Sequence, residues 1–174
     1  GVLRGLRLQR LAPALPDWPA DGAVQLRGRP DAPQLSAQLN DRQQRELRAE
    51  LALAGVGAAR KLLLNTLQLR DGPARLDGAG ELALVGERAF RLNATLRQLN
   101  PARWSPQLDA GQLNAALSVQ GAAQPLRVQG ELTLADSQYR GQPASARLRG
   151  QWDGQRAHGL SLDEHGWAPL DAVV

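Results

Sequence analysis

Cysteine and methionine are both absent from the 174 residues, and aromatic residues make up only 3% of them. Without cysteine the chain has no disulfide, no thiolate metal ligand and no thiol nucleophile. A packed β-sandwich usually fills the space between its sheets with large aromatic side chains, yet Phe90 and Tyr139 are the only phenylalanine and tyrosine. The chain therefore lacks covalent cross-links and most of the usual large core residues.

Long apolar runs are also missing. No stretch approaches the roughly 20 apolar residues that a membrane-spanning helix needs. Arginines interrupt residues 1–11, so we expect no signal-peptide core there. Any membrane anchor is expected outside this chain, which we interpret as an internal stretch of a longer protein.

The basic residues are almost all arginine, since Lys61 is the only lysine, and the net charge is +4. The arginines are spread over successive polar positions, and aromatic residues that could stack on bases are few. Nucleic-acid binding usually needs a clustered basic patch with such aromatic platforms. We therefore predict no nucleic-acid partner.

The clearest positive signal is an alternation of apolar and polar residues that returns along the chain. Apolar residues alternate with arginine, asparagine and threonine in 90–97, and a similar alternation occupies 126–134. Successive side chains of a strand point to opposite faces, so each run presents one apolar and one polar face. About a dozen such runs, separated by turn residues, predict an all-β fold.

One segment allows two secondary structures. Residues 35–53 are predicted to form a hairpin with a polar turn at 40–44, because the alternation continues on both sides of the turn. Leu47 and Leu51 lie four residues apart among good helix formers, so a helix over 41–53 is the alternative. The unbroken alternation favours the strand.

Two further patterns concern the arrangement of the strands. The apolar parity changes at Asn65 and Thr66, which predicts a β-bulge. Residues 81–96 resemble residues 116–132 at an offset of about 35, and each unit contains two alternating runs joined by a glycine-containing turn. Repetition of this kind favours an elongated sheet or solenoid, in which each unit contacts mainly its neighbours.

The predicted inner face is almost purely leucine, alanine and valine, and it leaves two interpretations open. A smooth face without directional contacts suits acyl chains, whereas a biased base composition would also produce a leucine-rich, normally packed core. For the first interpretation we expect an elongated, antiparallel-rich sheet whose apolar face forms an open groove, within a single domain over residues 1–174. The residues predicted to line that groove are Leu62, Leu64, Leu82, Leu84, Phe90, Leu92, Ala94, Leu96, Leu117, Val119, Leu126, Val128, Leu132 and Leu134.

Catalytic motifs are not found. The chain contains no nucleophile elbow, phosphate-binding glycine loop or HExxH helix, and its only histidines are His158 and His165. Asp163 and His165 would share one face of an extended segment, so a metal pair and a solvated loop are the two interpretations there. We predict no enzyme activity, no metal and no cofactor.

The tryptophans also allow more than one role. Single tryptophans near turns cap the open end of a sheet, or they mark a sugar-binding surface or a membrane interface. The four positions concerned are Trp18, Trp104, Trp152 and Trp167.

Several stretches, in this order, resemble the TamB family. The longest are LQLRDGPARLDGAGELAL (67–84) and AFRLNATLRQLNPARW (89–104). Shorter similar segments follow at 113–121, at 136–143 and in the tryptophan- and glycine-containing tail 150–170. Each piece is of low complexity, and their order carries the resemblance, which extends from about Leu47 to Leu170.

The resemblance implies a specific setting. TamB-like proteins are anchored in the inner membrane of Gram-negative bacteria by an N-terminal helix and cross the periplasm. They belong to the AsmA-like repeating β-groove group, so the resemblance implies an elongated sheet curled into a β-taco with an apolar concave interior. This channel is thought to carry phospholipids towards the outer membrane, and the family is linked to autotransporter assembly with an outer-membrane partner, TamA. On this resemblance we expect a periplasmic segment of a lipid conduit, with the anchor and the contact to a TamA-like protein outside this chain. The alternative is a structural or adhesive β-solenoid or sandwich module of a surface protein with a closed, dry core.

Overall fold

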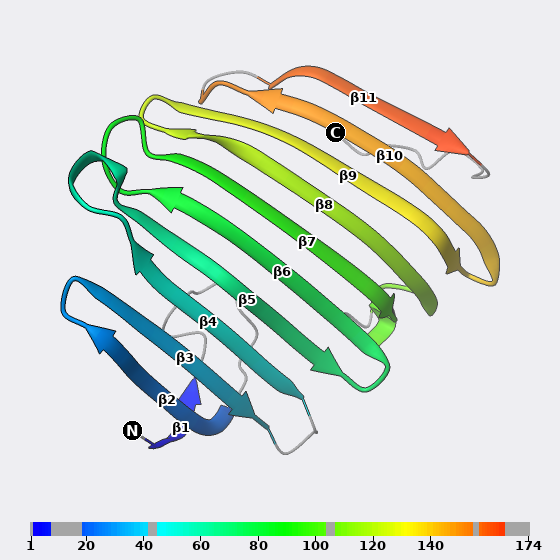
Figure 1. Cartoon of the computed structure of the whole chain (residues 1–174). Coiled ribbons are helices and arrows are strands. Elements are labelled where there is room, and N and C mark those ends of the chain that lie inside the picture. The colour runs from blue at the N-terminus through cyan, green and yellow to red at the C-terminus, as the bar shows by residue number, and fades with distance from the viewer. Residues whose placement is uncertain (1, 8–18, 42–44, 104–106, 155–156, 166–174) are drawn as a thin grey trace.

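The computed structural model describes residues 2–7, 19–41, 45–103, 107–154 and 157–165. Within these ranges the chain forms one antiparallel sheet of eleven strands that follow one another in sequence order (Figure 1). The strands are β1 (Val2–Arg7), β2 (Pro19–Arg29), β3 (Ala32–Asn40), β4 (Glu46–Ala54), β5 (Lys61–Asp71), β6 (Ala74–Ala83), β7 (Ala89–Leu99), β8 (Gly111–Ala123), β9 (Leu126–Tyr139), β10 (Gln142–Trp152) and β11 (Ala157–His165).

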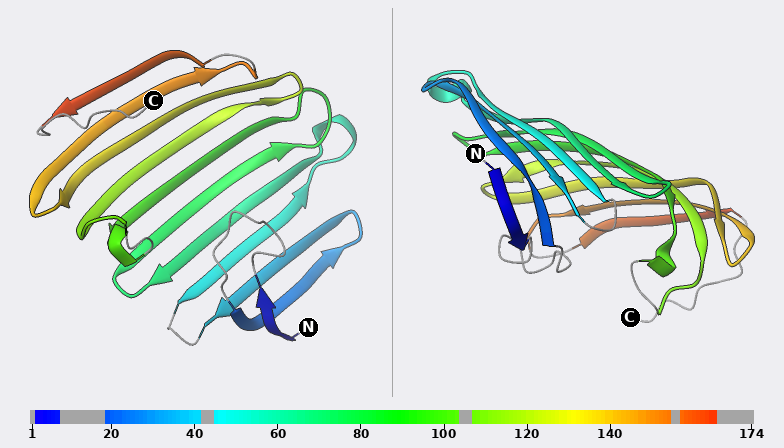
Figure 2. Two further views of the ribbon diagram at one scale, coloured as in Figure 1. Left: turned by 180° about the vertical axis from the view of Figure 1, so that it is seen from behind. Right: turned by 90° about the horizontal axis from the view of Figure 1, so that it is seen from below.

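The all-β prediction is confirmed, and the sheet is open. β1 and β11 each pair on one side only, so the sheet does not close on itself. It is twisted (Figure 2), and eleven strands at about 4.8 Å spacing extend over roughly 50 Å. The described ranges contain a single layer, which has neither the second sheet of a sandwich nor the coils of a solenoid.

The meander places its connections alternately at two edges. Here the word edge refers to the ends of the strands and not to the outermost strands β1 and β11. The even edge carries the connections after β2, β4, β6, β8 and β10, and the odd edge, at the opposite ends of the strands, carries those after β3, β5, β7 and β9. Two short 3-10 helices belong to these connections. η2 (Gly57–Ala59) lies at the even edge, and η3 (Pro101–Arg103) lies at the odd edge.

The ambiguous segment and the bulge are both resolved. Residues 46–54 form the strand β4, so the hairpin prediction is confirmed and the helical alternative is wrong. In the β4–β5 pairing, Glu50 lies opposite Thr66 and Leu51 opposite Leu64, which leaves Asn65 as the extra residue of the predicted bulge. The two repeat units fall on the consecutive hairpins β6–β7 and β8–β9.

Polar side chains support two further irregularities near the odd edge. Gln98 in β7 and Asp136 in β9 have positive φ values of 55° and 48°, at points where the strand register shifts. Between them, the Asn114 side chain accepts a hydrogen bond from the Gln98 N–H at 2.9 Å, and the Ser137 hydroxyl accepts one from the Asn114 N–H at 2.8 Å. These bonds satisfy backbone groups that the shifted ladder leaves unpaired.

Few residues are buried in this sheet. In the described part of the chain the buried hydrophobic residues are Leu39 and four alanines, and no large side chain is fully buried. Stability must therefore come largely from the backbone ladder and from cross-strand side-chain pairs, each of which contributes up to about 1 kcal/mol.

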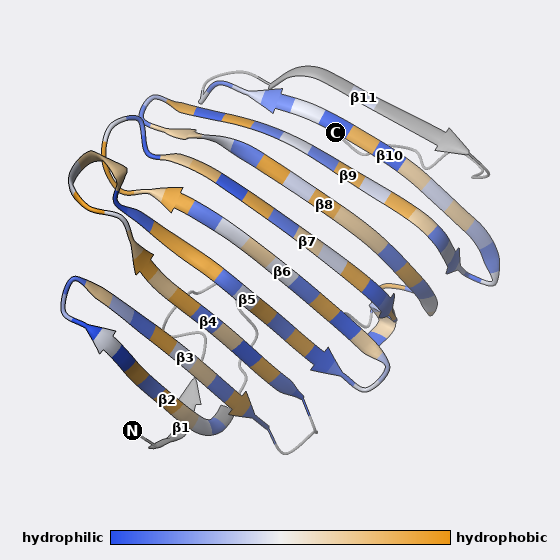
Figure 3. Cartoon of the chain, in the orientation of Figure 1, coloured by the Kyte–Doolittle hydropathy of each residue, from blue (hydrophilic) through white to orange (hydrophobic). Residues whose placement is uncertain are grey.

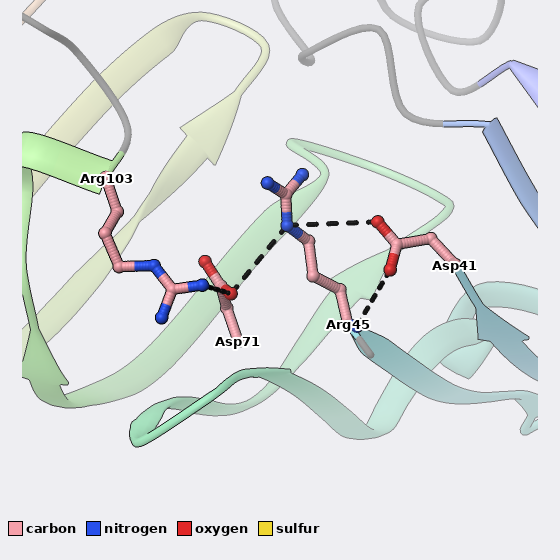
Figure 4. Close-up of polar contacts among 4 residues, drawn as sticks. All are labelled: Asp41, Arg45, Asp71 and Arg103. Carbon is pink, nitrogen blue, oxygen red and sulfur yellow. Dashed lines mark hydrogen bonds and ion pairs between the residues drawn. The ribbon is translucent and has the colours of Figure 1, made fainter. Parts of the chain in front are cut away.

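An ion cluster around the buried Asp71 fixes η3 to the odd edge (Figure 4). Asp71, at the end of β5, is only 4% exposed and accepts a 2.8 Å hydrogen bond from the Arg103 guanidinium of η3. Arg45 Nε lies 3.8 Å from Asp71 and 3.9 Å from Asp41. Gly72 leaves room for this arrangement, because a Cβ there would lie 2.9 Å from Arg103 Nη1.

We expect Asp71→Ala to lower the free energy of unfolding by about 2 kcal/mol, because it removes the charge-assisted hydrogen bond from Arg103 and the contact with Arg45. Chemical denaturation measures this effect. Glu46→Ala is the matched control, since its exposed carboxylate lies 3.9 Å from Arg70 and should contribute less than about 1 kcal/mol. Equal losses in the two variants would contradict a special role for the cluster.

Candidate functional site

The cross-strand register brings the predicted groove residues onto one face of the sheet. Phe90 of β7 lies opposite Leu82 of β6, and Leu92 lies opposite Val119 of β8. Directly opposed residues share a face, so each such row extends across neighbouring strands. We call this surface the apolar face, and its members from β3 to β10 include Leu35, Leu39, Leu47, Leu51, Leu62, Leu64, Leu67, Leu69, Leu76, Leu82, Phe90, Leu92, Ala94, Leu96, Leu117, Val119, Val128, Leu132, Leu134 and Leu148.

Two predicted groove residues lie at the border of this face. Leu84 follows the last residue of β6 and donates its N–H to the Arg60 carbonyl at 2.9 Å. Leu126 begins β9 opposite Ala123 and is 39% exposed. Both lie at the even edge, where the apolar face ends.

The apolar face is wider than the predicted groove. Leu35 of β3, Leu51 of β4 and Leu148 of β10 continue its rows beyond the strands assigned to the groove. Their alternation is visible in the sequence, but only the pairing order shows that β3 and β10 belong to the same sheet as β5–β9. Across these eight strands the face measures roughly 35 Å by 20 Å.

The fourteen predicted groove residues are all at least partly exposed. Leu126 and Leu132 are each 39% exposed, and the other twelve are half-buried. Lateral neighbours on adjacent strands cover their flanks, whereas no second described layer covers their tips. An extended apolar surface of this kind is unusual, since a monomer seldom exposes a contiguous apolar patch beyond a few hundred Å².

Glycines keep this face level beside its larger side chains. A Cβ on Gly121 would lie 3.0 Å from the Phe90 ring and 1.9 Å from the Arg127 carbonyl oxygen. A Cβ on Gly80 would lie 2.6 Å from the Arg91 carbonyl oxygen and 3.3 Å from Leu92. The rings and methyl groups of the neighbours therefore occupy the space above the glycine backbone.

The opposite, polar face carries cross-strand ion pairs. Glu131 of β9 accepts hydrogen bonds from Arg147 at 2.6 Å and from Arg149 at 3.1 Å, both on β10. These two bonds hold the pKa of the Glu131 carboxyl below its ordinary value. Lys61 and Glu81 form another pair at 3.2 Å.

Hollows in the described surface lie among polar-face side chains. One of about 500 Å³ is lined by Arg91, Gln120 and Gln129, among others. Another, of about 580 Å³, includes Asn93 and Thr95 in its lining. These furrows differ from the predicted concave apolar interior, which stays a prediction.

Other predicted features fall partly outside the described residues. Trp18, Trp104 and Trp167 lie outside them, and so do the side chains of His158, Asp163 and His165, although the last three belong to β11. Trp152 is described and is 42% exposed. Among the described side chains, no three histidine, aspartate or glutamate residues gather into a group suited to a metal ion.

The described helices are two single turns, and none could span a membrane. Comparison with known proteins gave no match to a protein-family model, to a curated protein or to a solved structure.

The Glu131 pKa has a testable consequence for stability. Because the folded-state pKa lies below the unfolded one, the two arginine contacts stabilise the fold above the unfolded pKa, and this contribution is lost as pH falls through the folded pKa. We expect the difference in unfolding free energy between wild type and Glu131→Gln to shrink over that acidic range. Denaturation at a series of pH values measures it.

Titration of the Glu131 carboxyl by NMR provides the control. Arg147→Gln and Arg149→Gln should each raise the midpoint, whereas Arg91→Gln, which removes a polar-face charge elsewhere, should leave it unchanged. If none of the three substitutions changed the midpoint, the two arginine hydrogen bonds would not be the cause of the lowered Glu131 pKa.

Proposed function

We propose that the apolar face holds phospholipid acyl chains, and that the chain is an internal segment of a TamB-like conduit across the periplasm. The observation that carries the proposal is a single-layer sheet whose continuous leucine-rich face has no covering layer among the described residues. Burying such surface gains roughly 25 cal/mol per Å², and acyl chains offer a flexible apolar cover. The TamB resemblance supplies the choice of lipid over other apolar partners.

The dimensions agree with this occupant. The apolar face is roughly 20 Å long in the strand direction, from the row of Phe90 to the row of Leu96. The hydrocarbon of one bilayer leaflet is about 15 Å thick, which is half of the roughly 30 Å core. One acyl chain therefore fits within the width of the face.

The composition of the face also suits movement of the chains. Leucine, alanine and valine offer no directional hydrogen bonds, so an acyl chain could shift from one row to the next without breaking a specific contact. Gly80 and Gly121 project no side chain of their own between the neighbouring rows. Transport of this kind needs no catalytic group, and the proposal includes no enzyme activity.

The wider TamB-like setting forms part of the same proposal. A β-taco shape would arise if the twisted sheet curled around the bound chains, with the apolar face inside. The inner-membrane anchor and the contact with a TamA-like outer-membrane protein would lie in regions outside this chain. The proposed location is the periplasm of a Gram-negative bacterium.

We expect phospholipid to co-purify with the chain when it is isolated without detergent, and to be detected by native mass spectrometry and lipid extraction. Leu92→Asp and Val128→Asp should each lower the amount of bound lipid by roughly tenfold, because acyl chains cannot solvate a charge placed on the apolar face. Circular dichroism should report an intact sheet, since both positions are partly exposed.

Asn93→Asp is the matched control, because it adds the same charge one residue away on the exposed polar face. It should leave the lipid content unchanged. A lipid-free, stably folded wild-type monomer would refute the proposal and would favour a structural module whose apolar face is covered by protein.

A further inference from the structure

Exposed apolar side chains gather at the even edge. The described chain has nine exposed large hydrophobic residues, and the odd edge carries only Leu108. Four others, Leu26, Leu35, Leu132 and Leu148, lie within strands on the apolar face. The remaining four follow the even edge from the β4–β5 connection onward: Val56, Val85, Leu126 and Trp152.

Val56 and Val85 occupy connections between strands, where polar side chains are usual. Val56 is 78% exposed beside η2, and Val85 is 48% exposed in the β6–β7 connection. Trp152, at the end of β10, is 42% exposed, and tryptophan is enriched where one end of a side chain is wet and the other apolar.

Arginines lie between these apolar side chains. Arg60 follows η2, and Arg88 lies in the β6–β7 connection; both are exposed, and neither has an ion-pair partner among the described residues. Arg29 and Arg127 add two more cations, each with one acidic neighbour. Asp153, next to Trp152, is an exposed acidic residue of the same edge, so the unpaired positive charge lies at the β4–β5 and β6–β7 connections.

The odd edge differs in its charge arrangement. Arg103 and Arg45 are both held by Asp71, and Arg140 is paired with Asp109. Arg70 likewise lies 3.9 Å from Glu46. Arg75 and Arg97, exposed near the same edge, also form no ion pair among the described residues, so the even edge is distinguished only by the exposed apolar residues that lie beside its unpaired arginines.

Backbone contacts join most of the even-edge connections into one line (Figures 1 and 3). The Leu84 N–H bonds to the Arg60 carbonyl at 2.9 Å, and the Gln124 N–H bonds to the Glu87 carbonyl at 3.0 Å. A Cβ on Gly154 would lie 3.2 Å from the Leu126 carbonyl oxygen, so the β10–β11 connection adjoins the β8–β9 turn. Connections after alternate strands recur at intervals of about 10 Å.

We propose that the even edge docks on the surface of an anionic phospholipid membrane. Val56, Val85 and Trp152 would enter the headgroup region, while Arg60 and Arg88 would contact lipid phosphates. Apolar side chains with interleaved basic residues provide the two attractions that interfacial binding uses, buried apolar area and charge complementarity. The proposal goes beyond the lipid-conduit function and requires no lipid on the apolar face.

The electrostatic part is tested with the double variant Arg60→Gln/Arg88→Gln in vesicle co-sedimentation. A basic residue near an anionic surface contributes about a fivefold gain in affinity, so we expect roughly a 30-fold loss on phosphatidylcholine–phosphatidylglycerol vesicles. Wild-type binding should weaken at high salt and on phosphatidylcholine alone. Arg75→Gln/Arg97→Gln removes two exposed odd-edge arginines and should bind as wild type.

The apolar part is tested with Val56→Ser/Val85→Ser. We expect a loss of at least roughly tenfold on the same vesicles, because two exposed apolar side chains no longer enter the headgroup region. Leu108→Ser, which removes an exposed apolar side chain at the odd edge, should have no effect. Circular dichroism checks that every variant folds.

The outcomes separate this proposal from the conduit. Even-edge variants should retain co-purified phospholipid, whereas Leu92→Asp should retain vesicle binding and lose that lipid. No binding of the wild type to anionic vesicles would overturn membrane docking, whatever the lipid content. So would salt-independent binding, or equal losses in the odd-edge and even-edge variants.

Discussion

The whole structure depends on a cross-strand register that keeps apolar residues on one side of the sheet from β3 to β10. A slip of one residue would move a strand's apolar side chains to the polar face. Bulges preserve the arrangement where the spacing of apolar residues changes. Because Asn65 is an extra residue, Leu67 lies in the row of Gly78 and Ala94. Gln98 is at a second irregularity, after which Leu99 lies opposite Leu113.

A single layer with such a register cannot bury its own apolar face. The polar face needs no covering layer, because its side chains form ion pairs, as at Glu131, or are exposed amides and arginines. On the apolar face the described side chains contact only their lateral neighbours. Gly121 leaves room for the Phe90 ring, and Gly80 leaves room for Leu92. An apolar partner would therefore stabilise the fold by mass action, because it binds the folded sheet and not the unfolded chain.

The even and odd edges differ in structure. At the odd edge the hydrogen bond from Arg103 to Asp71 holds η3 against the end of β5. At the even edge the face continues into exposed side chains such as Leu126 and Trp152. The lipid-conduit and membrane-docking proposals are physically compatible, since the open end of the apolar face would meet the membrane surface.

The sequence alone determined the strands and their faces, because a period of two in 90–97 and 126–134 is a local property of the chain. The bulge at Asn65 was visible for the same reason, and the change of spacing from Leu96 to Leu99 could have revealed a second one. Only the tertiary structure decided which strands adjoin, that Arg103 meets Asp71 across 32 residues, and that exposed apolar residues gather at one edge. Alternation specifies the face on which a side chain lies, whereas what covers that face depends on contacts between residues distant in sequence.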